Sequence, residues 1–177
     1  MNLEKRIIAF VKLGNILREF ALDSTNSPIK EAIKKAQQHN GWFTEENVIN
    51  MIGEIGKSFE EGKIRKWLSN YKIENDKPSE KKVGVIMAGN IPLVGFHDFL
   101  CVLMSGNIFV GKLSSDDEFL LSAVANLLCK IEPEFKKQIH FIKQIIFLIY
   151  TMCYFQTIIV MTFCFANTSI SQQHKKY

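Results

Sequence analysis

Two polar residues stand out in this sequence, because each comes at the end of a short apolar run that predicts a buried strand. Asn90 follows the run 83–87 after a two-residue turn, and Lys112 lies at the end of the run 108–113. A side-chain amide fixed at such a turn could stabilise an oxyanion, as acyl-transfer and aldehyde chemistry require. A lysine ammonium at the second strand end could hold the ribose or a phosphate of a nucleotide.

Each residue also has an ordinary structural explanation. Asparagine and glycine are common at strand-to-helix turns, and a lysine at a strand end often keeps its ammonium in water. The loop is not a G-x-G-x-x-G dinucleotide fingerprint, and the sequence contains no P-loop. Residue types and spacing therefore leave both the functional and the structural interpretation open.

The elements around these residues alternate between strand and helix. Residues 93–105 have apolar side chains at helical spacing, and Pro92 suits the first turn of that helix because proline lacks an N–H and has a fixed φ. The second strand candidate follows a glycine-asparagine helix stop. A strand, a helix and a second strand of these lengths predict a β-α-β unit with parallel strands. Asn90 and Lys112 would then lie at the same edge of the sheet.

A second helix is predicted after Lys112. Ser114 or Ser115 is the expected N-cap, and the acidic run 116–118 is the expected first turn. The helix should continue to Lys130. Residues 83–142 therefore form the α/β part of the chain.

Residues 1–71 are expected to form amphipathic helices that precede the α/β part. Apolar residues recur there at helical spacing between lysines and arginines. Ser27 before a proline and Thr44 before two glutamates are typical helix starts. The polar stretch 72–82 is the predicted linker and the best internal boundary.

Composition excludes several classes of function. The 177 residues suit about one domain. The net charge is only +4, and no dense lysine and arginine tract suggests a nucleic-acid partner. The polar start of the chain predicts no signal peptide and a cytoplasmic location. Four cysteines form no C-x-x-C pair and match no metal-site spacing, so we expect free thiols and no metal; they are Cys101, Cys129, Cys153 and Cys164.

The apolar tail 143–177 differs from the rest of the chain. Residues 144–174 contain no lysine, arginine, aspartate or glutamate. One interpretation is an aberrant end produced by a frameshift or a premature gene boundary. The other is a transmembrane helix over 145–166, since this uncharged run exceeds the roughly 20 residues that cross a bilayer. Lysines on both sides of the run are compatible with the second interpretation.

The stretch "AGNIPLVGFHDFLCVLMSGNIFVGKLSSDD" resembles the nucleotide-binding half of the acyl-CoA reductase family (LuxC type), a branch of the aldehyde dehydrogenase superfamily. Asn90 to Leu93 match the superfamily pattern asparagine, any residue, proline and an aliphatic residue. Gly106, Asn107 and Lys112 match the pattern Gly-Asn, a short apolar strand and a lysine. The motifs "NGWF" at 40–43 and "KWLSNY" at 66–71 look like the N-terminal part of this family, so the resemblance covers roughly residues 1–142.

The resemblance implies a Rossmann-like nucleotide-binding domain and reduction of a fatty acyl thioester to a fatty aldehyde with NADPH. It makes Asn90 the oxyanion-hole amide, and it places Lys112 on the adenosine ribose or its 2′-phosphate. Ser115 stands where NAD-preferring relatives often carry a glutamate, and a neutral residue there does not repel a 2′-phosphate. Ser114 and Ser115 could also donate hydrogen bonds to that phosphate. The dipeptide Ala88-Gly89 in place of Pro-Trp departs from the wider superfamily and fits this branch.

The nucleophilic cysteine of the family belongs to a later domain, and no cysteine of this sequence matches its motif. We therefore expect this polypeptide to be inactive alone. The alternative is a non-catalytic chain, either a small membrane-anchored protein or a nucleotide-binding relic.

Overall fold

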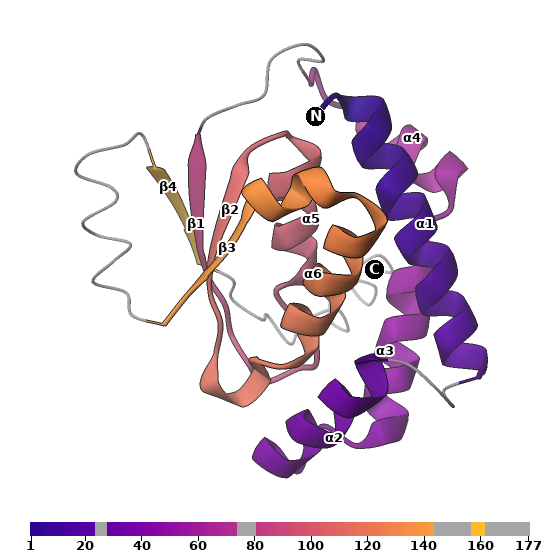
Figure 1. Cartoon of the computed structure of the whole chain (residues 1–177), viewed down its shortest axis with the longest axis vertical. Coiled ribbons are helices and arrows are strands. Elements are labelled where there is room, and N and C mark those ends of the chain that lie inside the picture. The colour runs from indigo at the N-terminus through magenta and orange to yellow at the C-terminus, as the bar shows by residue number, and fades with distance from the viewer. Residues whose placement is uncertain (24–27, 74–80, 144–156, 162–177) are drawn as a thin grey trace, which may run out of the picture.

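In a computed structural model of the chain, the described residues are 1–23, 28–73 and 81–143, together with the backbone of 157–161. Helices lie on one side of a small parallel sheet (Figure 1). The described elements are, in chain order, α1 (Leu3–Leu22), α2 (Pro28–His39), α3 (Glu45–Ser58), α4 (Glu61–Leu68), β1 (Lys82–Ile86), α5 (Phe96–Met104), β2 (Ile108–Lys112), the 3-10 helix η1 (Ser115–Asp117), α6 (Leu120–Ile131), the 3-10 helix η2 (Pro133–Lys137), β3 (Ile139–Ile142) and β4 (Thr157–Met161).

The predicted N-terminal helices are confirmed. Thr44 caps α3 as expected, because its Oγ1 accepts a hydrogen bond of 3.3 Å from the N–H of Asn47. Asn2 caps α1 in the same way, with its Oδ1 2.9 Å from the N–H of Lys5. The predicted cap Ser27 and most of the predicted linker 72–82 lie outside the described residues.

The predicted parallel β-α-β unit is also confirmed. The strand order is β3-β2-β1-β4, and every neighbouring pair is parallel. In the register of β1 and β2, Ile86 faces Lys112, so the two strands end together. Helix α5 makes the crossover between them, and α5 and α6 lie on the same side of the sheet (Figure 1). Right-handed crossovers that step in one direction across a parallel sheet require this arrangement.

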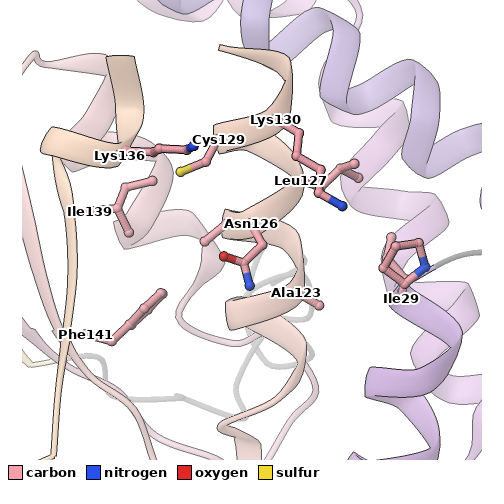
Figure 2. A pocket seen from close by; sticks show the side chains of 11 residues that line it. Ile29, Ala123, Asn126, Leu127, Cys129, Lys130, Lys136, Ile139 and Phe141 are labelled. Carbon is pink, nitrogen blue, oxygen red and sulfur yellow. The ribbon is translucent and has the colours of Figure 1, made fainter. Parts of the chain in front are cut away.

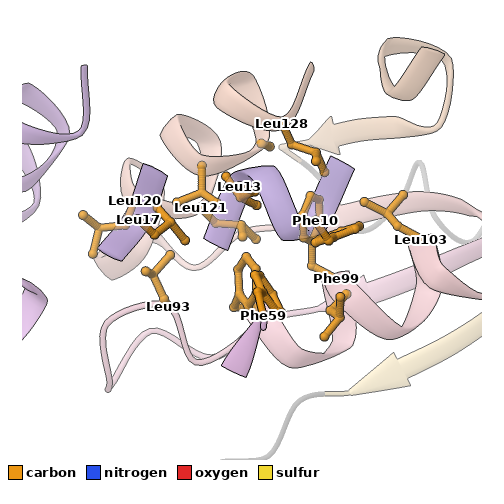
Figure 3. Close-up of a cluster of buried hydrophobic side chains, with 14 of the residues drawn as sticks. Phe10, Leu13, Leu17, Phe59, Leu93, Phe99, Leu103, Leu120, Leu121 and Leu128 are labelled. Atoms are coloured by element: carbon orange, nitrogen blue, oxygen red, sulfur yellow. The ribbon is translucent and has the colours of Figure 1, made fainter. Parts of the chain in front are cut away.

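One hydrophobic core joins the helical segment to the sheet. The ring of Phe10 in α1 meets Phe59 at 5.5 Å and Phe135 at 5.8 Å between ring centroids, in both cases edge to face. Phe59 in turn lies 5.5 Å from Phe96 at the start of α5. Figure 3 shows Phe10 and Leu13 of α1 gathered with Phe59, Phe99 and Leu121 of later segments. Packing between distant segments therefore fixes the position of the N-terminal helices.

Two helix starts differ from the sequence prediction. Helix α5 begins at Phe96, so Pro92 lies in the turn before the helix and not in its first turn. The reason is local, because Leu93 has a φ of 57°, which a continuous right-handed helix excludes. Helix α6 begins at Leu120, and two of the three acidic residues predicted in its first turn lie in η1.

Little of the tail 143–177 belongs to the described residues. Residues 157–161 form β4, which adds to the sheet beside β1. The rest of the predicted transmembrane run 145–166 lies outside the described residues. Within the part of the chain that the structure describes, no helix is both long enough and apolar enough to span a bilayer.

Candidate functional site

The loops that follow β1 and β2 pack directly against each other. A Cβ atom placed on Gly89 would lie 2.4 Å from Oγ and 2.6 Å from Cβ of Ser114, so only glycine allows this contact without a shift. The side chain of Ser114 is held in place, because its Oγ accepts a hydrogen bond of 3.2 Å from the N–H of Asp116. The loops that carry Asn90 and Ser115 are therefore held together at the carboxyl edge of the sheet. Ligands of parallel α/β sheets bind at this edge.

Asp117 fixes the backbone shape of the Asn90 loop through a buried hydrogen bond. Its carboxylate is buried, with the residue 6% exposed, and Oδ2 accepts a hydrogen bond of 2.7 Å from the N–H of Leu93. Leu93 has the left-handed φ, which costs a residue with a Cβ roughly 1 kcal/mol or more. The hydrogen bond offsets part of that cost, so Asp117 holds the backbone turn that lies between Asn90 and α5.

Burial raises the pKa of Asp117 to about 6, although the backbone N–H groups of Leu93 and Leu120 lower it. Oδ1 is buried and makes no hydrogen bond of normal geometry to any described residue. The sequence prediction missed this role, because an aspartate after a serine cap looks like a solvated residue in the first turn of a helix. No signal in the sequence distinguishes Asp117 from Asp116.

Asn90 is exposed and lines a shallow hollow of about 610 Å³. The opposite wall is the turn between α2 and α3, which contains the "NGWF" motif. Asn40 anchors this turn, since its Nδ2 lies 3.5 Å from the carbonyl oxygen of Gly89 and its Oδ1 accepts a hydrogen bond of 3.0 Å from the N–H of Trp42. Trp42 is 84% exposed at the rim. The N-terminal helical segment thus forms part of the wall around the predicted oxyanion amide.

Lys112 and Ser115 line a second and larger groove of about 710 Å³. It is lined by residues of α2, of α6 and of the end of β3, which include Phe141. A neighbouring hollow of about 600 Å³ shares Asn126 and Phe141 with this groove and continues it between α6 and β3 (Figure 2). Together the two spaces form an elongated cleft along α6.

The structure places the predicted site residues in two adjacent spaces. Asn90 lines the smaller hollow and Lys112 lines the groove, while the neighbours Asp116 and Ser115 line one space each. Ser114 lines neither of these two spaces, because it lies against Gly89. Asn90 and Lys112 therefore lie at the ends of two neighbouring strands, at one edge of the sheet, but line separate spaces.

Neither described cysteine has the environment of a nucleophile. Burial raises the pKa of the Cys101 thiol, and the carboxylate of Asp98 raises it further. Burial also raises the pKa of Cys129, against the opposing charge of Lys136. A reactive cysteine needs the reverse, a lowered pKa that yields the thiolate at neutral pH. Cys153 and Cys164 lie outside the described residues.

The described residues also contain no group of three histidine, cysteine or acidic side chains that could hold a metal ion. His97 comes nearest to such chemistry, with its Nε2 3.5 Å from the Sγ of Cys101. This pair lies on the side of α5 that faces Trp67, at 6.4 Å between the ring centroids of His97 and Trp67.

A model of one protein family, acyl-CoA reductase (LuxC), matches residues 24–145 of this sequence. The chain belongs to the acyl-CoA reductase (LuxC) family. The match includes α2, both loops of the candidate site and β3, so the whole elongated cleft lies within the family region of this reductase chain.

Among solved structures, the chain is similar to the glyceraldehyde-3-phosphate dehydrogenase GapN from Methanocaldococcus jannaschii DSM 2661, crystallised as a complex with NADP. The sequence identity is 14% and the TM-score is 0.41, over 81% of this chain and 37% of the GapN chain. No curated protein matches the sequence. The reductase chain thus spans little more than a third of the length of that dehydrogenase.

Proposed function

We propose that this acyl-CoA reductase chain supplies the NADPH-binding groove and the oxyanion amide for the reduction of a fatty acyl thioester to a fatty aldehyde. The observation that carries the proposal is the contact between Gly89 and Ser114, which holds the Asn90 loop beside the loop of Ser115. Family membership supports the reaction class. The two hollows support separate roles for the loops, with the acyl group at Asn90 and the cofactor at Lys112 and Ser115.

The groove fits a nucleotide by its chemistry. Lys112 supplies a cation, Ser115 supplies a hydroxyl donor, and Phe141 supplies an apolar surface on which a planar base could lie. When bound, NADPH supplies the hydride that reduces the acyl group. Ser115 is better placed for phosphate binding than Ser114, since Ser115 lines the groove and Ser114 does not.

Asn90 serves the acyl group. An amide N–H donor that is fixed before the reaction stabilises the negative charge that develops on the thioester carbonyl oxygen. The bond from Leu93 to Asp117 and the contact of Gly89 with Ser114 hold the loop on both sides of Asn90, so its backbone is already ordered. Preorganisation of this kind is what makes such a donor effective.

Replacing Lys112 with alanine is expected to weaken NADPH binding about tenfold or more, because the groove loses the cation at the end of β2. Calorimetric titration of the purified chain with NADPH measures this. Lys34→Ala is the matched control, since Lys34 is an exposed lysine of α2 that does not line the groove. Equal affinities of the wild-type chain and the Lys112→Ala variant would contradict the proposed cofactor site.

The chain of 177 residues is expected to form no aldehyde from a fatty acyl thioester and NADPH. The described thiols have raised pKa values, and neither lines the hollow of Asn90, where the acyl group would bind. The assay follows the oxidation of NADPH, and trapping of the aldehyde tests for the product. Sustained aldehyde formation would contradict the predicted inactivity of this chain.

The second candidate is a nucleotide-binding chain without chemistry of its own. The observation that favours it is the raised pKa of both Cys101 and Cys129. Saturable NADPH binding without turnover is common to this candidate and to a reductase fragment. Addition of the remaining reductase domains distinguishes them, because only a fragment of a working enzyme gains activity when it is completed.

A further inference from the structure

The groove that contains Lys112 is lined by a second lysine, from the N-terminal helical segment. Lys35 of α2 lines the same space as Lys112 and Ser115, although it lies far from them in the sequence. Helix α2 is held at this position by its packing on α6 and by the turn at Asn40, which contacts Gly89. The position of Lys35 is therefore set by the fold and not by a flexible end of the chain.

Lys35 is available to a ligand. Its Nζ lies 3.9 Å from Oε1 of Glu31 one helical turn away, with both side chains more than half exposed. Exposed ion pairs of this kind contribute little to the stability of a helix. An ammonium group that is held so weakly can turn from Glu31 to a stronger anion at small cost.

The charges that line the groove favour an anionic ligand. Three lysines line it, and they are Lys35, Lys112 and Lys143. Only two carboxylates do so, Glu31 and Glu118. Ser115 and Ser122 add hydroxyl donors. Two ammonium groups from different elements, with a serine hydroxyl between α2 and α6, suit a phosphate monoester, which has several acceptor oxygens and carries close to two negative charges near neutral pH.

We propose that Lys35 is a specificity-determining residue of the cofactor groove, and that its ammonium binds the 2′-phosphate that distinguishes NADPH from NADH. This inference rests on the proposed function, because it assumes that the nucleotide lies in the groove of Lys112. It assigns to the N-terminal helical segment a direct part in cofactor choice. Lys112 and Ser115 then contact the adenosine ribose and the same 2′-phosphate.

The test compares NADPH and NADH as ligands of the purified chain by calorimetry. Lys35→Ala is expected to weaken NADPH binding about tenfold and to leave NADH binding unchanged, because NADH has no 2′-phosphate. Lys35→Arg should keep most of the NADPH affinity, since the charge remains. Lys34→Ala is the matched control, because it removes the same charge from the neighbouring exposed position of α2.

The outcomes separate this inference from the function on which it rests. If Lys35→Ala and Lys34→Ala change NADPH affinity equally while Lys112→Ala weakens it, Lys35 has no such role and the cofactor groove stands. If Lys35→Ala weakens NADPH and NADH alike, Lys35 contacts a part common to both, and the 2′-phosphate assignment is wrong. If the wild-type chain binds no NADPH at any concentration, the groove and the role of Lys35 both fail.

Discussion

Replacing Asp117 with asparagine is expected to remove a fall in stability of about 3 kcal/mol that the wild-type chain shows between about pH 4 and pH 6. The usual pKa of this side chain is 3.8, and burial raises it to about 6 in the folded chain. Asparagine cannot ionise, so the variant has no such step.

The sign follows from proton binding. Between pH 3.8 and about 6 the folded state holds a proton on Asp117 that the unfolded state has lost. Stability therefore falls as the pH rises through this window, and the full cost remains at neutral pH. The hydrogen bond that the carboxylate of Asp117 accepts from the N–H of Leu93 offsets part of this cost.

Urea unfolding of both chains from pH 3.5 to pH 8, written as the difference between their free energies of unfolding, measures this effect with about 10–15% extrapolation error. Glu4 and Glu134 contribute the opposite slope, because hydrogen bonds from Arg65 and Lys5 respectively lower the pKa of each. Their contributions cancel in the difference. Asp116→Asn, at the exposed neighbouring position, should leave the slope intact. If the difference between the two free energies of unfolding does not vary with pH, the pKa of Asp117 is not raised in the folded chain.

Gly89→Ala is expected to destabilise the chain by about 1–3 kcal/mol, as overpacking typically does. The new Cβ would lie 2.4 Å from Oγ and 2.6 Å from Cβ of Ser114, and the second of these atoms cannot rotate away. The two loops must separate, so the affinity for NADPH should fall together with the stability. Urea unfolding and calorimetric titration of the same preparation measure both quantities.

The companion change Ser114→Gly tests the mechanism, since it removes both atoms that the new methyl group would strike. The double variant should recover most of the lost stability, which gives a favourable coupling energy of about 0.5–3 kcal/mol in the double-mutant cycle. Gly62→Ala is the control, because a Cβ at that position meets nothing within 4 Å. Strictly additive effects of the two changes would mean that the loops do not touch.

The sequence could predict the β-α-β unit because its signals are local. The apolar runs that became β1 and β2 are each bounded by turn residues, and the helix between them has a clear apolar period. Parallel strands that are joined by one crossover end at the same edge of the sheet, so the sequence alone predicts that Asn90 and Lys112 lie at one edge. Family membership was likewise carried by two short motifs at the correct spacing.

The contributions of α2 and of Asp117 could not be predicted, because both depend on contacts between distant segments. Nothing in the sequence near Lys35 shows that α2 packs along α6 and brings this lysine to the groove. The sequence predicts Asp117 in the first turn of a helix. In the structure it lies in η1 and is buried, with its carboxylate bonded to the N–H of Leu93 in the left-handed turn. Tertiary packing decided both cases.

The aromatic contact between Phe10 and Phe135 has a consequence for synthesis of the chain. The apolar face of α1 can pack on α3 and Phe59 early, but its contacts with Phe135 and α6 form only after more than 130 residues have been translated. At about 5–20 residues per second, the part of α1 that packs on α6 and Phe135 therefore stays exposed to water for several seconds during synthesis. Nascent chains of this protein should accordingly engage chaperones until η2 emerges.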